Sequence, residues 1–100
     1  MVTLKSIDEC DGVPHANVFP AEEPKTIRLS LEEGERVGAH SHPDRQVVLY
    51  LISGELDLQL DGESHVVQTG DVVQFDGMRE VAPVATADST ALIVLAKKNE

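Results

Sequence analysis

The amino-acid sequence predicts an all-β domain built as a sandwich or a small closed barrel. Apolar residues alternate with polar ones over short segments, as in strands with one buried face. Turn-forming residues recur roughly every eight to twelve residues, a spacing typical of sandwiches and barrels. No segment shows convincing helical periodicity. Because closing a sheet removes its exposed edges, we expect a jelly-roll barrel.

The first half of the chain is expected to form an arm and then the first barrel strands. Residues 1–25 show little periodicity and are assigned to the arm, ahead of a barrel domain over residues 26–100. The first clear strand, residues 25–31, alternates apolar and polar side chains. Residues 46–52 are apolar on both faces, which predicts a central strand.

The second half contains the clearest alternation in the sequence. Leu56, Leu58 and Leu60 alternate with polar residues and are followed by Asp61-Gly62, a pair that favours a tight hairpin turn. The remaining expected strands cover residues 64–68, 71–75, 80–85 and 90–96. The sequence therefore predicts seven or eight strands with short connections.

The charge balance excludes several classes of partner. Lys and Arg total 8 against 18 Asp and Glu, which gives a net charge of −10. Such a chain is not expected to bind nucleic acid or an anionic membrane. The acidity serves solubility or, in a sharper hypothesis, adaptation to a salty cytoplasm. Cys10 is the single cysteine, so nothing demands an oxidising compartment, and a cytoplasmic location is expected.

One cluster of residues indicates metal chemistry. His40 and His42 are two apart, so in an extended chain their side chains share a face. Gln46 has the same parity and joins that face if the intervening corner preserves the alternation. Two imidazoles and an amide oxygen form a plausible open metal site. The alternative is a pair of surface histidines at the end of a strand.

The spacing around this pair resembles that of the cupin family. The first cupin motif reads G-x5-H-x-H-x3or4-E-x6-G. This sequence is similar to it: Gly34 is followed after five residues by His40-Ser41-His42, then after three residues by Gln46, and later by Gly54. Residues 70–80 occupy the place of the second motif, G-x5-P-x-G-x2-H-x3-N. The resemblance implies a jelly-roll barrel of six to eight strands with a metal inside, and it implies that the chain pairs as a homodimer.

The sequence departs from both motifs. Gln46 stands where the first motif has Glu, and seven residues instead of six precede Gly54. Aligned on Gly77, the histidine of the second motif falls on Glu80, whereas an ungapped alignment places it on Val81. A Glu80 ligand would preserve the single negative charge of the usual three-His, one-Glu set. The expected ligands of a divalent Fe, Mn, Ni or Zn ion are therefore His40, His42, Gln46 and Glu80.

The resemblance implies several functions because the cupin fold hosts many. The leading hypothesis is a metal-binding cupin that acts on a small oxygenated molecule, such as a sugar acid or an enol or diketone. Tyr50, expected to line the cavity or to belong to the core, and Glu80 are candidates for moving protons. His65 is interpreted as a strand residue and His15 as a surface or interface residue. The alternatives are a non-catalytic binding or sensing module and a metal-free relic of the fold.

Overall fold

The protein consists almost entirely of β-strands. The computed structural model describes residues 2–98, and within them eight strands follow a single turn of 3-10 helix, η1. The elements are η1 (Ile7–Glu9), β1 (His15–Asn17), β2 (Lys25–Leu31), β3 (Arg45–Ser53), β4 (Glu55–Leu60), β5 (Glu63–Gln68), β6 (Val72–Asp76), β7 (Val81–Ala85) and β8 (Ser89–Lys97). The all-β prediction is confirmed.

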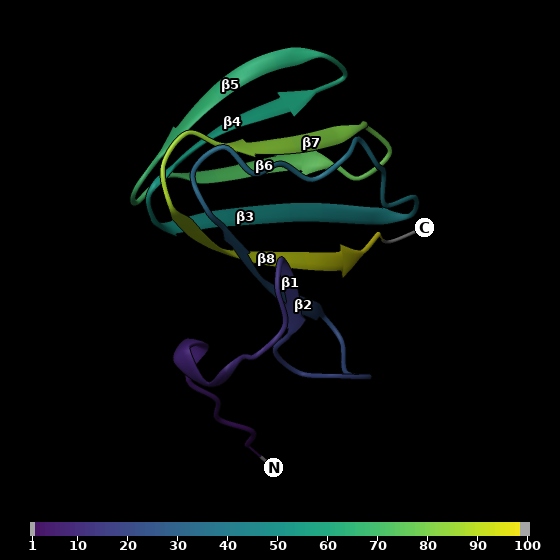
Figure 1. The fold of residues 1–100 in the computed structure, drawn as a ribbon. Helices are drawn as coiled ribbons and strands as arrows, with labels where there is room; N and C mark the ends of the chain where they lie inside the picture. The colour runs from purple at the N-terminus through teal and green to yellow at the C-terminus, as the bar shows by residue number, and fades with distance from the viewer. Residues whose placement is uncertain (1, 99–100) are drawn as a thin grey trace.

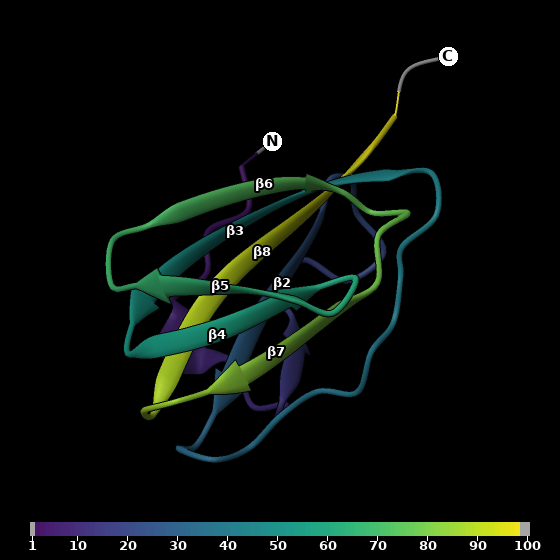
Figure 2. The same cartoon turned by 90° about the horizontal axis from the view of Figure 1, so that it is seen from above.

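The strands form two antiparallel sheets that face each other. The larger sheet has the order β1-β2-β8-β3-β6 and the smaller one the order β5-β4-β7. Figure 1 shows β4, β5 and β7 stacked above β3 and β8, and Figure 2 shows the smaller sheet lying across the larger one. The connections cross between the layers, which gives the jelly-roll arrangement that the sequence predicts.

The β4–β5 hairpin forms as its sequence predicts. The three leucines of β4 are at most 3% exposed, while the polar residues between them are partly exposed. Asp61 and Gly62 join the strands with φ values of 52° and 82°, the left-handed backbone that such a two-residue turn requires. Leu60 pairs with Glu63 directly beside this turn. Local sequence therefore determines this hairpin.

The core lies between the two sheets and is aliphatic apart from one aromatic ring. β3 is central, as expected, because it pairs with β8 on one side and β6 on the other. The buried residues are Leu29, Leu31, Val47, Leu49, Leu51, Leu56, Leu58, Leu60, Val67, Phe75, Val81, Ala85, Ala91 and Leu95. Their burial is the main stabilising contribution to the fold.

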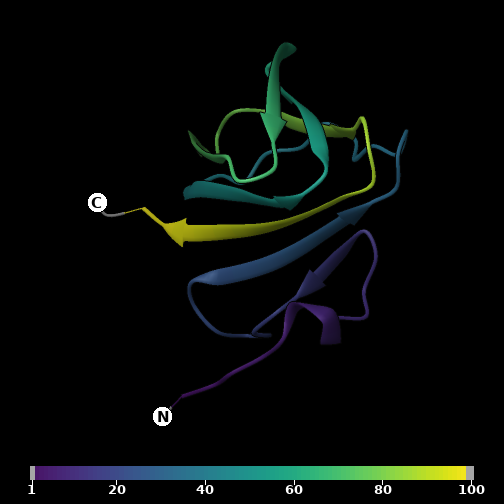
Figure 3. The ribbon, with the colours of Figure 1, turned by 90° about the vertical axis from the view of Figure 1, so that its left-hand side faces the viewer.

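The N-terminal segment is attached to the edge of the larger sheet. β1 pairs with β2, and Figure 3 shows it beside β2 at the lower side of the molecule. Ser30 donates a backbone hydrogen bond of 2.8 Å to the carbonyl of Pro14, and the buried Arg28 guanidinium donates one to the carbonyl of Gly12. These bonds hold the backbone on both sides of His15. Among residues 2–98, no helix is long and apolar enough to cross a membrane.

Candidate functional site

The histidine pair lies in the connection between β2 and β3, where backbone hydrogen bonds hold it against β7. His40 and Val81 exchange backbone hydrogen bonds of 3.1 and 2.8 Å. The His42 N–H donates to the carbonyl of Gly77 at 2.6 Å. The connection is therefore a fixed extended segment along the open edge of the smaller sheet.

Gly77 allows this close approach. A Cβ atom at position 77 would overlap the carbonyl of His42 and lie 2.7 Å from the carbonyl oxygen of Arg45. The N–H of Gly77 donates to that Arg45 carbonyl at 2.8 Å. Gly77 is buried and its φ is not in the left-handed region, so the position requires glycine for space.

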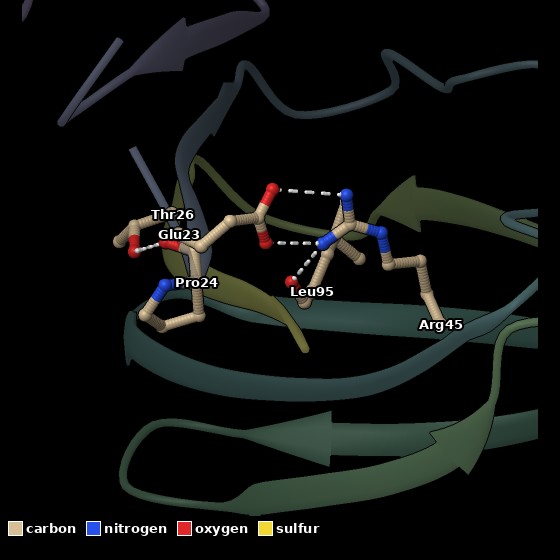
Figure 4. Close-up of polar contacts among 5 residues, drawn as sticks. All are labelled: Glu23, Pro24, Thr26, Arg45 and Leu95. Carbon is tan, nitrogen blue, oxygen red and sulfur yellow. Dashed lines mark hydrogen bonds and ion pairs between the residues drawn. The ribbon is translucent and has the colours of Figure 1, made fainter. Parts of the chain in front are cut away.

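An ion pair holds the β1–β2 connection against the start of β3. The Arg45 guanidinium donates to both carboxylate oxygens of Glu23, at 2.7 and 3.1 Å, and to the carbonyl of Leu95 at 2.8 Å (Figure 4). This hydrogen-bonded ion pair lowers the pKa of Glu23 and raises that of Arg45. Arg45 therefore neutralises a neighbouring acid beside the histidine segment.

The two imidazole rings lie side by side. Their centroids are 4.9 Å apart and their planes are nearly perpendicular, at 89°. The His40 Nδ1 atom lies 2.8 Å from the carbonyl oxygen of Gly38. A carbonyl only accepts, so Nδ1 carries the proton and the lone pair of the neutral ring lies on Nε2. This hydrogen bond orients the His40 ring and leaves Nε2 as the atom that could bind a metal or a polar molecule.

The surroundings favour the neutral forms of His42 and His15. Burial lowers the pKa of His42, and the positive charges of His40, Lys25, His15 and Arg45 lower it further. Burial also lowers the pKa of His15, with His40 adding to the effect. At neutral pH, His15 and His42 therefore carry lone pairs that can bind a Lewis acid.

Both rings line a small cavity between the two sheets. Its volume is about 50 Å³, close to that of an ion with one water molecule. The lining residues are His15, Ile27, His40, His42, Val47, Leu49, Leu58, Phe75, Val81, Pro83 and Ile93. Polar side chains in this lining are confined to the three histidines. Within residues 2–98, no three His, Cys, Asp or Glu side chains are close enough together to hold a metal ion.

Gln46 does not join the face of the histidines. Val47 and Leu49 line the cavity, so the residues that alternate with them along β3, Gln46 and Tyr50, face away from it. The corner before β3 breaks the alternation, because Asp44 has a φ of 65°. Tyr50 is 41% exposed and lies outside the core, contrary to both placements expected for it.

Glu80 also lies away from the histidine pair. Its side chain is exposed, its N–H donates to the Asp61 carboxylate at 2.9 Å, and its carbonyl accepts from the Asp61 N–H at 2.8 Å. Val81 is 6% exposed and lines the cavity, so the fold agrees with the ungapped alignment of the second motif. The structure therefore does not place the Glu80 carboxylate among the side chains that line the cavity with His40 and His42.

His15 is exposed, in agreement with the expected surface position, and it also lines the cavity with His40 and His42. The register of β1 on β2 places His15 opposite Leu29 and beside the cavity. No spacing rule indicates this, because 24 residues lie between His15 and His40. His65 is a half-buried residue of β5, as interpreted, and its Nε2 lies 3.1 Å from the Glu63 carboxylate.

The two facing antiparallel sheets, with a histidine pair between them, define the class of double-stranded β-helix proteins. Residues 27–96 match the family model described as Cupin domain, and the chain belongs to this family. No curated protein matches the sequence.

Solved structures support the same fold. KdgF from Halomonas sp. is 18% identical, with a TM-score of 0.75 over 92% of this chain and 88% of that one. A predicted oxalate decarboxylase from Thermotoga maritima is 23% identical, with a TM-score of 0.75 over 84% and 79%. The cupin domain of an XRE family transcriptional regulator from Enterobacter cloacae is 20% identical, with a TM-score of 0.76 over 85% and 96%.

Proposed function

We propose that the protein is a small cupin that holds a divalent metal ion at His40 and His42 and binds a small oxygenated molecule there. The observation that carries this proposal is the pair of adjacent imidazoles lining one cavity, with the His40 ring oriented by the Gly38 carbonyl. Neutral imidazole suits Fe, Ni and Zn better than it suits Mg or Ca.

The chain's own residues would position and desolvate the ligand. A bound divalent ion acts as a Lewis acid toward an oxygen atom. The apolar side chains of Val47, Phe75 and Val81 keep the cavity poor in water, which strengthens electrostatic contacts with the histidines. With room for about 50 Å³, the cavity favours a small carboxylate or enol whose remaining atoms lie at its mouth. The similarity to a predicted oxalate decarboxylase supports this class of molecule.

Metal analysis tests the proposal directly. The purified protein is expected to bind one divalent ion, and His40→Ala and His42→Ala are each expected to abolish binding. His65→Ala serves as the matched control, because its ring lies on β5 outside the cavity. Full metal content in the His40 and His42 variants would refute the assignment.

A second function, a non-catalytic binding or sensing module, is favoured by the cavity lining. The lining contains no hydroxyl or carboxylate group that could move a proton, because Tyr50 and Glu80 lie elsewhere. The similarity to the cupin domain of a transcriptional regulator supports this alternative. A panel of small carboxylates and enols, assayed for turnover under air and argon and for thermal stabilisation, separates the two. Turnover indicates an enzyme, and stabilisation without turnover indicates a binding module.

We further propose a homodimer that pairs through the outer face of the larger sheet. Tyr50 lies opposite Val72 on β6 and Leu92 on β8, and Val48 lies opposite Val94. Tyr50 is 41% exposed and Val72 63%, so the patch is apolar and open in the single chain. Exposed apolar patches of this kind commonly mark interfaces.

The oligomeric state tests this interface. Val72→Glu is expected to convert a dimer into a monomer in light scattering after gel filtration. Val66→Glu is the matched control, since Val66 is 67% exposed on the smaller sheet. A monomeric wild-type protein, or a dimeric Val72→Glu variant, would contradict the proposal.

The remaining assignments also belong to the proposal. The net charge of −10 supports a small-molecule ligand in place of nucleic acid or an anionic membrane. The single cysteine supports a cytoplasmic location. The same charge supports adaptation to high salt, which is tested below by thermal unfolding.

A further inference from the structure

We propose that the molecule bound at His40 and His42 carries a short alkyl group, methyl or ethyl, which enters the cavity beyond the two rings. The inference rests on the proposed function, because it places the oxygen atoms of the bound molecule at these histidines. It narrows the small oxygenated molecule to a short aliphatic carboxylate, and it excludes a polyhydroxylated acid such as a sugar acid.

The cavity has two chemically different ends. His40 and His42 are half-buried, so their rings lie at the end that is nearer to solvent. Val47, Leu49 and Leu58 are at most 2% exposed and form the inner end. A molecule that enters from solvent therefore meets the imidazoles first and hydrocarbon side chains beyond them.

The inner end offers no hydrogen-bond partner to a hydroxyl group. Among the described residues that line the cavity, every side chain other than the three histidines is aliphatic or aromatic hydrocarbon. The backbone there is engaged as well, because β3 pairs with β6 and β8, and Val81 exchanges hydrogen bonds with His40. A hydroxyl group placed at this end loses its hydrogen bonds to water without replacement, whereas a methyl group gains from burial.

The size of the cavity limits the length of the alkyl group. Its volume is about 50 Å³, compared with about 30 Å³ for one water molecule in the liquid. Leu49 and Phe75 of the larger sheet and Leu58 of the smaller one belong to the packed core. Because packed cores contain little free space, an alkyl group longer than about two carbons would have to displace these side chains.

Two carboxylates that differ at one end test the inference. Butyrate and 3-hydroxypropionate carry the same charge and have nearly the same length, but butyrate ends in a methyl group and 3-hydroxypropionate in a hydroxyl group. In NMR titrations of the full chain, metal-free and loaded with Zn²⁺, butyrate is expected to bind about 10- to 100-fold more tightly. It is also expected to shift the methyl signals of Leu49 and Leu58, which line the inner end.

Threonine variants test the role of the cavity wall. Val47→Thr replaces one methyl group of the wall with a hydroxyl group and keeps the branched shape, so the preference for butyrate is expected to fall several-fold. Val81→Thr is a second variant in case the first fails to fold, since Val81 also lines the cavity. Val66→Thr is the matched control with an unchanged preference, because Val66 is 67% exposed and lies outside the cavity lining.

The outcomes separate the inference from the proposed metal site. Equal affinity for the two acids, or a preference that both cavity variants leave unchanged, overturns the inference even if metal binds at His40 and His42. A preference for butyrate that falls in the cavity variants and persists in Val66→Thr supports the inference. If the same result is obtained with a protein that takes up no metal, it supports the inference and overturns the proposed metal site.

Discussion

Gly77→Ala is expected to destabilise the fold and displace His42. The added Cβ would overlap the His42 carbonyl, so the turn between β6 and β7 must move away from the histidine segment. That movement weakens the 2.6 Å bond from the His42 N–H and the 2.8 Å bond to the Arg45 carbonyl. At about 0.5–1.5 kcal/mol for each bond, the free energy of unfolding falls by about 1–3 kcal/mol. Overpacking strain acts in the same direction.

Urea and thermal unfolding followed by circular dichroism measure this loss. For a domain of this size, 2 kcal/mol corresponds to a decrease in Tm of about 8–16 °C. Gly38→Ala is the matched control, because a Cβ there meets nothing within 4 Å and its φ is not left-handed. The control is expected to be neutral or to stabilise by up to about 1 kcal/mol. An unchanged urea midpoint in Gly77→Ala would refute the close approach.

Three further perturbations test the electrostatics and the core. Hydrogen bonds from Arg79 and Lys98 lower the pKa values of Asp61 and Asp76 below their ordinary value of 3.8. The two ionised carboxylates therefore stabilise the fold fully above pH 3.8, and this contribution is lost as the pH falls through the lowered pKa values. When the pH is lowered below about 4, the free energy of unfolding measured in urea is expected to fall less in the double variant Asp61→Asn, Asp76→Asn than in the wild type. If the net charge of −10 is an adaptation to high salt, the Tm is expected to rise in about 1 M NaCl, where the Debye length of about 3 Å screens the repulsion between surface acids. An unchanged or lower Tm contradicts this hypothesis. Leu56→Ala truncates a side chain that is 0% exposed, and it is expected to lower the free energy of unfolding measured in urea by about 2–5 kcal/mol. A smaller loss would indicate that the core collapses into the space that the truncated side chain leaves.

Strands and turns were predictable because their signals are local. Alternation of apolar and polar residues at a period of two places one set on the buried face whatever the partner strand is. The Asp61-Gly62 turn depends on the φ angles of two adjacent residues, which their own chemistry favours. Seven of the observed strands accordingly lie within a few residues of their expected bounds.

Which side chains line the site was less predictable, because this depends on the backbone conformation at Asp44 and on the backbone pairing of His40 with Val81, which are far apart in the sequence. The left-handed φ of Asp44 shifts the alternation and brings Val47 to the cavity in place of Gln46. The backbone pairing of His40 with Val81 decides between two alignments that the sequence leaves open, and it excludes Glu80 from the cavity.

The sequence by itself determined an acidic all-β chain with a cupin motif and an adjacent pair of histidines. These properties follow from composition and from contacts between near neighbours in the chain. Only the tertiary structure decided which side chains surround that pair. The reason is that the register of β1 on β2 brings His15 to the cavity, and such long-range pairing leaves no periodic trace in the sequence.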